Sequence, residues 1–203
     1  DGIICNVGPS QSIYVVRRDG KIFEVIQTPT LSIINNFLDK SEIDLLRDFM
    51  RIKHRLNNNS FLQEDFNQDT WFYGDPVIES LMINKQKVLE KYSNCELLPT
   101  FSEWKFNTHG AEVESFSKRE ACEFTCYCVI DFKTKVDWTF YIQKQKINLK
   151  IGDALFYEGA KNHYYRKPLD GEYFADATLH YVKKGGKYQD WIKDKRLTYG
   201  VYK

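Results

Sequence analysis

The chain has 203 residues, of which 42% are hydrophobic and 15% aromatic, and its formal net charge is +1. This length fits one domain with a sizeable core, and a near-neutral charge without a long basic run argues against nucleic acid or an anionic membrane as the main partner. No stretch approaches about 18 consecutive apolar residues, and the first residues lack the pattern of a signal peptide. We therefore expect no membrane span and an intracellular, cytoplasmic location.

The cysteines support a reducing compartment. There are five of them, an odd number without a repeating spacing, which argues against a secreted disulfide scaffold. Cys126 and Cys128 lie on one face of a predicted strand, but a metal site would need a second close pair of ligands, and none is present. We interpret these cysteines as buried structural thiols.

The first part of the chain predicts a hairpin, a strand and a helix. Residues 12–27 alternate in hydrophobicity around an Asp-Gly turn, which is a strong short-range hairpin pattern. Residues 31–38 predict a strand that leads into a turn. An amphipathic helix is predicted over 41–54, with Ser41 as its N-cap.

A polar, irregular stretch follows at residues 57–76 and predicts a loop of functional length. Pro76 suits the first turn of a helix, so a second helix is predicted to begin there. The apolar stripe of that helix is expected to comprise Val77, Leu81, Val88 and Leu89.

From residue 97 to residue 183 the pattern changes to short strands at roughly ten-residue spacing, which is typical of a sandwich or barrel. Residues 184–203 predict a short helix and an extended end. We predict a single α+β domain over 1–203. Its N-terminal hairpin, strand and helices occupy 1–96, its β core 97–183 and its C-terminal extension 184–203.

Four stretches, in this order, carry a family resemblance: SIINNFLDKSEIDLLRDFM (32–50), WKFNTHGAEVESFSKREACEFT (104–125), INLKIGDALFYEG (147–159) and YYRKPLDGEYFADATLHYV (164–182). They resemble the 2-oxoglutarate/Fe(II)-dependent oxygenases, in particular the prolyl-hydroxylase-like branch, over roughly residues 31 to 183. The resemblance implies a double-stranded β-helix, that is, a jelly roll of two facing sheets, with the predicted helices packed on it.

The same resemblance places the family's metal ligands, a His-x-Asp pair and a distal histidine. Family spacing from Gly110 puts the pair at Phe116 and Lys118, and spacing back from Gly171 puts the distal histidine at Tyr164. A phenyl ring cannot bind iron, a protonated lysine repels it, and one tyrosine does not make a facial triad. The resemblance thus implies a replaced metal triad, no catalytic residue, and no use of the family's Fe(II) and 2-oxoglutarate.

Two alternatives stay open at these positions. His109, Glu114 and His163 are metal-ligating residue types that would make an unconventional metal site if the fold gathered them. The ammonium of Lys118 either takes the place of the metal and hydrogen-bonds to Tyr164, or bends out to the cleft mouth as a solvated charge.

The family's cosubstrate anchor is a basic residue about nine to eleven positions after the distal histidine. The corresponding positions here lack Lys and Arg; they are Tyr173, Phe174 and Ala175. Arg166 matches an arginine of the family and is a candidate to hold an acid group with two parallel hydrogen bonds. Its more ordinary role would be an ion pair with Asp170 or Glu172.

We infer a pseudo-oxygenase, not an enzyme, with a binding or assembly role toward a protein or small-molecule ligand. The alternative is a divergent active 2-oxoglutarate-dependent dioxygenase or hydroxylase acting on a protein or small molecule. A third class is a sugar or peptide binder with an aromatic-rich cleft. Its stacking surfaces would come from residues that are more often core: Trp71, Tyr73, Trp104 and Trp138.

Overall fold

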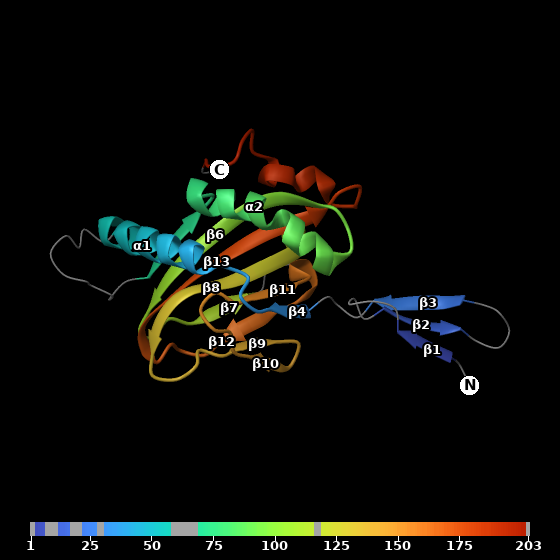
Figure 1. The fold of residues 1–203 in the computed structure, drawn as a ribbon, viewed down its shortest axis with the longest axis horizontal. Coiled ribbons are helices and arrows are strands. Elements are labelled where there is room, and N and C mark those ends of the chain that lie inside the picture. The colour runs from blue at the N-terminus through green and yellow to red at the C-terminus, as the bar shows by residue number, and fades with distance from the viewer. Residues whose placement is uncertain are drawn as a thin grey trace.

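A computed structural model describes residues 3–6, 12–16, 22–27, 31–57, 69–115 and 119–201. Two antiparallel sheets face each other in the β core (Figure 1). The larger sheet has the order β4 (Leu31–Ile34), β11 (Ala154–Tyr157), β8 (Phe124–Thr134), β13 (Gly171–Lys183), β6 (Leu97–Thr108) and β5 (Thr70–Tyr73). The smaller sheet has the order β10 (Gln145–Ile147), β9 (Phe140–Ile142), β12 (Tyr164–Arg166) and β7 (Val113–Ser115).

Two long helices cover the outer face of the larger sheet, α1 (Lys40–Asn57) and α2 (Pro76–Ser93) (Figure 1). One apolar core lies between these helices and the sheet, and includes Met50, Met82 and Trp104. A second lies between the two sheets and includes Phe140 and Leu155. The predicted α+β jelly roll with N-terminal helices is therefore confirmed.

The predicted hairpin is confirmed as the pair β2 (Ser12–Val16) and β3 (Ile22–Gln27), to which β1 (Ile3–Asn6) adds a third antiparallel strand. Its turn lies outside the described residues. Figure 1 shows this small sheet beside the β core and apart from it. The organisation of 1–203 as a single domain stays a prediction.

Helix α1 begins with a different cap from the one predicted. The backbone N–H of Glu42 donates to the Asp39 carboxylate at 2.9 Å, and the Glu42 carboxylate accepts from the Asp39 backbone N–H at 2.9 Å. This reciprocal pair is a capping box. Ser41 only donates its hydroxyl to Asp39. Ser41 as N-cap was therefore wrong, because an Asp three residues before a Glu satisfies two helix N–H groups at once.

Helix α2 begins at Pro76 as predicted. Its cap is Asp75, whose carboxylate accepts from the Val77 backbone N–H at 3.0 Å. The stripe was partly wrong, because Val88 is 37% exposed. Val88 lies beside the buried face of the helix. The apolar residues of that face are Ile78, Leu81, Met82 and Leu89.

Part of the expected loop over 57–76 is ordered. Helix α1 continues to Asn57, and Thr70–Tyr73 form β5, which pairs antiparallel with β6 at the edge of the larger sheet. Local sequence did not reveal this strand because it has only four residues and depends on a partner thirty or more positions away.

The C-terminal extension is tied down by buried charges. It contains the predicted short helix as η3 (Gln189–Lys195), which is 3-10 helical and kinked. Arg196 forms an ion pair with Glu79 of α2, and the Tyr199 hydroxyl donates to the Pro99 carbonyl at 3.0 Å. Among the helices described, none combines the length and apolar character that a membrane span requires.

Alternation along β8 and β13 decides which side chains face which core. Cys126 and Cys128 are fully buried on the helix side of the larger sheet, so the prediction of buried thiols on one strand face is confirmed for them. On β13, Tyr173 and Ala175 also face the helices, whereas Phe174 faces the space between the sheets.

Candidate functional site

Of the three positions expected to replace the metal ligands, Tyr164 is described and Phe116 and Lys118 lie outside the described residues. Tyr164 opens β12 and pairs in register with Ser115 of β7. Its ring stacks on Phe140, with ring centroids 4.6 Å apart, in the core between the sheets. Tyr164 thus faces inward, and its strand partner is the residue directly before position 116.

The unconventional metal site is not assembled. His109, Glu114 and His163 are all exposed. Within the described ranges, no three His, Cys, Asp or Glu side chains gather closely enough to hold a metal ion. Glu114 lies in the middle of β7, whereas His109 and His163 lie in the segments that follow β6 and precede β12.

Arg166 lies in a cage of aromatic rings. The residue is 5% exposed, and its guanidinium carbon lies between 4.4 and 5.2 Å from four ring centroids, those of Tyr127, Trp138, Phe140 and Phe174. Its Nε and Nη1 atoms are enclosed and have no hydrogen-bond partner among the described residues. A cation over several π faces gains electrostatic stabilisation without a carboxylate.

The expected ion pair of Arg166 with Asp170 or Glu172 was wrong. Asp170 pairs with Lys135 at 3.2 Å, and Glu172 pairs with Lys133 at 2.7 Å. Both acids lie on the outside of the molecule, whereas β12 directs Arg166 into the core. Sequence proximity suggested a contact that strand alternation prevents.

The positions aligned with the cosubstrate anchor divide between the two cores. Phe174 points between the sheets, is 3% exposed, and stacks on Phe132 with centroids 5.3 Å apart. Tyr173 points to the helix side, where its hydroxyl donates to Asp131 at 2.9 Å. Burial, together with that hydrogen bond, raises the pKa of Tyr173 to about 12.

Asp176 is a buried acid near the cage that sequence reasoning missed. It is 4% exposed, and its carboxylate accepts from the Asn107 amide at 2.8 Å. Burial raises the pKa of Asp176, while the positive charge of Arg166 opposes that shift. The available signal was an acid between two alanines in the middle of a long predicted strand.

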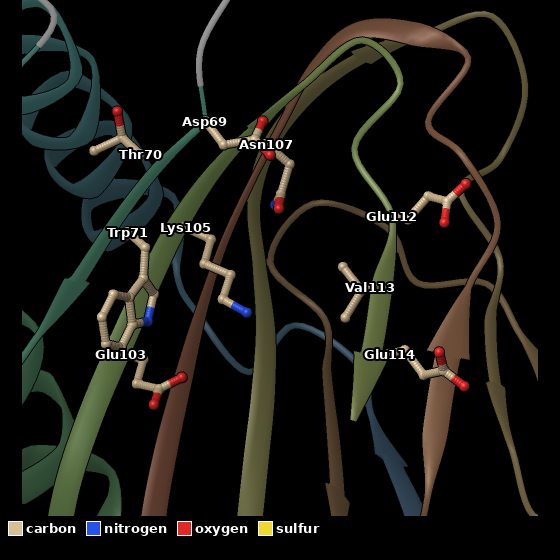
Figure 2. A pocket seen from close by; sticks show the side chains of 9 residues that line it. All are labelled: Asp69, Thr70, Trp71, Glu103, Lys105, Asn107, Glu112, Val113 and Glu114. Carbon is tan, nitrogen blue, oxygen red and sulfur yellow. The ribbon is translucent and has the colours of Figure 1, made fainter. Parts of the chain in front are cut away.

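A cleft of about 430 Å³ opens between the edge of the larger sheet and β7 (Figure 2). We call it the mouth cleft; Figure 2 shows Lys105 of β6 and Val113 of β7 pointing toward each other across it. Glu112 and Glu114 flank Val113 along the chain, and Figure 2 shows their side chains pointing away from Lys105. Burial raises the pKa of Glu103 in the cleft wall, opposed by the Lys105 charge and the Trp71 side chain.

A second cavity, the inner cavity, has a volume of about 230 Å³. It shares Glu103, Lys105, Val113 and Glu114 with the mouth cleft, so the two are neighbours along β6 and β7. Its deeper wall is rich in polar groups that the sequence did not single out: Thr125, Tyr157, Thr178 and His180. Tyr164 also lines it.

His180 is a neutral base in the wall of the inner cavity. It is 7% exposed, its Nδ1 lies 3.1 Å from the Thr125 hydroxyl, and its ring stacks on Phe101 with centroids 4.3 Å apart. Burial lowers the pKa of His180 to about 3. The imidazole therefore offers hydrogen bonds without charge at neutral pH.

Arg119 closes another side of the inner cavity. It forms an ion pair with the fully buried Asp194 of η3, which also accepts from the Tyr73 hydroxyl. Its guanidinium carbon lies 4.5 Å from the Phe101 ring centroid. The C-terminal extension thereby fixes a cavity-lining side chain, a contact between residues 75 positions apart.

Only one of the four aromatic residues considered as stacking surfaces is available for a ligand. Trp71 is 50% exposed and lines the mouth cleft. The other three are core residues, each with 9% exposure or less: Tyr73, Trp104 and Trp138.

No family model matches the chain, and no curated protein sequence matches it. Solved structures do share its fold. The viral collagen prolyl hydroxylase of Paramecium bursaria Chlorella virus-1, in complex with 2-oxoglutarate, has a TM-score of 0.56 at 16% identity, over 82% of this chain and 98% of that chain. A Pseudomonas putida prolyl-4-hydroxylase has a TM-score of 0.54 at 10% identity, over 78% and 95%.

HygX from Streptomyces hygroscopicus, with iron bound, has a TM-score of 0.56 at 12% identity, over 77% of this chain and 83% of that chain. At such identities the likeness establishes the fold alone. The chain therefore has the jelly-roll fold of the 2-oxoglutarate/Fe(II) oxygenases.

Proposed function

We propose that the chain is a non-catalytic member of the 2-oxoglutarate/Fe(II) oxygenase fold, a pseudo-oxygenase that binds a protein or small-molecule ligand. The observation that carries this proposal is the filled interior around Arg166. Phe174 is the inward-facing residue among the positions aligned with the cosubstrate anchor, and it packs against Trp138 with centroids 5.1 Å apart. A phenyl ring offers no donor to a carboxylate.

The residues aligned with the metal ligands support the same proposal. Fe(II) in this family requires imidazole and carboxylate ligands on one face. Here the corresponding residues are Phe116, Lys118 and Tyr164. This donor set does not fit Fe(II), since one phenol is the only oxygen ligand it contains. We derive no oxidative step for the chain.

One observation favours a second role, in which Arg166 holds a small acid. Its enclosed Nε and Nη1 groups lack partners, and a carboxylate would satisfy both. Calorimetric titration with 2-oxoglutarate in the presence of EDTA tests this role. Saturable binding that Arg166→Met abolishes supports it, and the absence of heat leaves the cage as a packing feature.

The proposed loss of catalysis is tested by metal loading. The purified chain is incubated anaerobically with Fe(II), desalted and examined by elemental analysis, and succinate formation from 2-oxoglutarate is measured in parallel. We expect no stoichiometric iron and no succinate. One iron per chain, lost in His163→Ala or Glu114→Ala, would instead establish the divergent active oxygenase.

A restored triad provides the matched comparison. The triple variant Phe116→His, Lys118→Asp and Tyr164→His returns the family's ligand types to the aligned positions. Iron in this variant and not in the wild type would assign the loss to these three substitutions. Iron in the wild type at the level of the triple variant contradicts the proposal.

A further inference from the structure

The inner cavity is lined by buried hydroxyl groups that no residue in the described part of the chain bonds. Tyr157 is 1% exposed and Thr178 is 9% exposed, and both line the cavity. Among the described residues, no side chain or backbone group forms a hydrogen bond with either hydroxyl. Buried hydroxyls are normally paired, and the adjoining cavity has room for a group that would pair with these two.

These hydroxyl and imidazole groups are uncharged, and they can both donate and accept hydrogen bonds. A tyrosine or threonine hydroxyl both donates and accepts, and the uncharged His180 ring has one nitrogen beyond the one that faces Thr125. Such groups match a ligand that also carries several groups able to donate and accept. Hydroxyl groups on neighbouring carbons have this property, whereas phosphates and carboxylates only accept.

Charge at the rim disfavours an anionic ligand. Glu112 and Glu114 line the mouth cleft and form no ion pair with any described residue. Lys105 is the cation among the residues that line the cleft. Asp69 and Glu103 bring the acids of the lining to four, so the cleft disfavours an anion. A carboxylate accepts hydrogen bonds from ligand hydroxyls, and an ammonium donates to them, so a polar ligand without negative charge can bond this lining.

An exposed indole completes the site. Trp71 is 50% exposed on β5, beside Glu103 in the wall of the mouth cleft (Figure 2). The C–H face of a sugar ring is apolar and packs on a flat aromatic surface, while the ring's hydroxyls remain free to bond. The mouth cleft and the inner cavity together reach the volume range of small-ligand sites.

We infer that the mouth cleft and inner cavity form a binding site for a neutral carbohydrate. Trp71 carries a sugar ring at the rim, and Tyr157, Thr178 and His180 bond the hydroxyls of the sugar that enters the cavity. This inference rests on the proposed non-catalytic binding function and names its ligand class.

The test is saturation-transfer NMR of the full chain in EDTA with a panel of neutral sugars: the methyl glycosides of glucose, galactose, mannose, xylose and N-acetylglucosamine, together with maltose and cellobiose. We expect saturable transfer to at least one sugar. Trp71→Ala should weaken its binding by about tenfold, and Tyr157→Phe by about fivefold. Circular dichroism and thermal melting establish that each variant is folded.

The matched controls are Tyr165→Ala and Tyr165→Phe. Tyr165 is an aromatic residue of similar exposure, 47%, that lies on the outer side of β12 and stacks on Tyr141. Both changes should leave sugar binding unaltered. Absence of transfer to every sugar overturns the inference, and so does binding that Trp71→Ala and Tyr157→Phe both leave intact.

Charged competitors separate the remaining ligand classes. Glucose 6-phosphate or an oligolysine peptide that binds more tightly than every neutral sugar would mean that electrostatics, not hydroxyl recognition, governs the cleft, and would overturn the inference. Because EDTA removes iron, failure here leaves the non-catalytic proposal intact. That proposal fails only through the iron and succinate measurements.

Discussion

Two arginines lie inside this fold with almost no exposed surface, and they are stabilised in different ways. Arg196 pairs with the buried Glu79 and donates to three backbone carbonyls, those of Lys193, Thr100 and Val201. Arg166 has four aromatic rings around it, and two of its nitrogens have no hydrogen-bond partner in the part of the chain that the structure describes.

The difference separates two kinds of buried charge. The Glu79–Arg196 pair joins residues 117 positions apart and fastens the C-terminal extension to α2, so losing one partner leaves the other charge uncompensated. Arg166 forms no ion pair among the described residues, although its charge acts on the nearby buried carboxylate of Asp176. Its cation lies against ring faces from three different strands and a loop.

The largest expected effect is that of Glu79→Gln. Arg196 would stay buried without a countercharge, so we expect the free energy of unfolding to fall by about 3–5 kcal/mol. Denaturant unfolding measures it. The control is Glu96→Gln, which removes an exposed pair with Lys184 and should cost less than about 0.5 kcal/mol. A loss below about 1 kcal/mol for Glu79→Gln would mean that Arg196, like Arg166, does not depend on a single ion-pair partner.

His180 adds a third way to bury a base, which is to leave it uncharged. Its pKa is lowered from 6.5 to about 3 by burial. Between these values the unfolded chain binds the proton and the native chain does not. The free energy of unfolding should therefore fall as the pH drops below 6.5, by up to about 1.4 kcal/mol per pH unit from this residue.

The measurement for His180 is denaturant unfolding from pH 4 to pH 8. His180→Gln removes the titrating ring, so its stability should depend less steeply on pH than that of the wild type below pH 6.5. Above pH 7 the two slopes should coincide. Equal slopes at pH 5 would mean that the imidazole is protonated in the native protein.

Replacing the caged arginine should have a smaller effect. Arg166→Met keeps an unbranched side chain in the aromatic cage, loses the cation–π attraction, and removes two unsatisfied N–H groups. These changes oppose each other, so we expect a stability change within about 1.5 kcal/mol in either direction. Arg196→Met, by contrast, should cost about 3 kcal/mol or more. A comparable loss for Arg166→Met would mean that the cation has a fixed countercharge, such as the buried Asp176.

The smallest effect is expected at the acids nearest to Arg166 in the sequence. Asp170→Asn removes an exposed pair with Lys135, which lies on the surface and is screened by water. The expected loss is less than about 0.5 kcal/mol, measured by the same unfolding titration. A larger loss in Asp170→Asn that disappears in the Arg166→Met background would establish the ion pair that the structure does not contain.

Much of the fold follows from local pattern. Pro76 marked the start of α2, and the spacing of apolar residues predicted both helices, because helix propensity and amphipathic periodicity act over a few neighbouring residues. The β5 strand was missed, since four residues at a sheet edge depend on pairing with β6. The cap of α1 was misassigned to Ser41 although the Asp39–Glu42 spacing was visible.

The sequence likewise predicted one part of the candidate site and missed another. Family spacing put Tyr164 on an inward position, and the strand register gives it that direction. The roles of Phe116 and Lys118 stay predictions. The polar wall of the inner cavity, with Tyr157 and His180, was not foreseen, because its members come from different strands and resemble ordinary core residues.

The sequence by itself determined that two helices precede a run of strands, and it determined the residue types at the family's ligand positions, because both depend on spacing along the chain. Only the tertiary structure decided that Arg166 enters an aromatic cage, that Phe174 and not Tyr173 faces between the sheets, and that Trp71 stays exposed. Those outcomes depend on which strands lie opposite one another, and the packing of distant segments sets that arrangement.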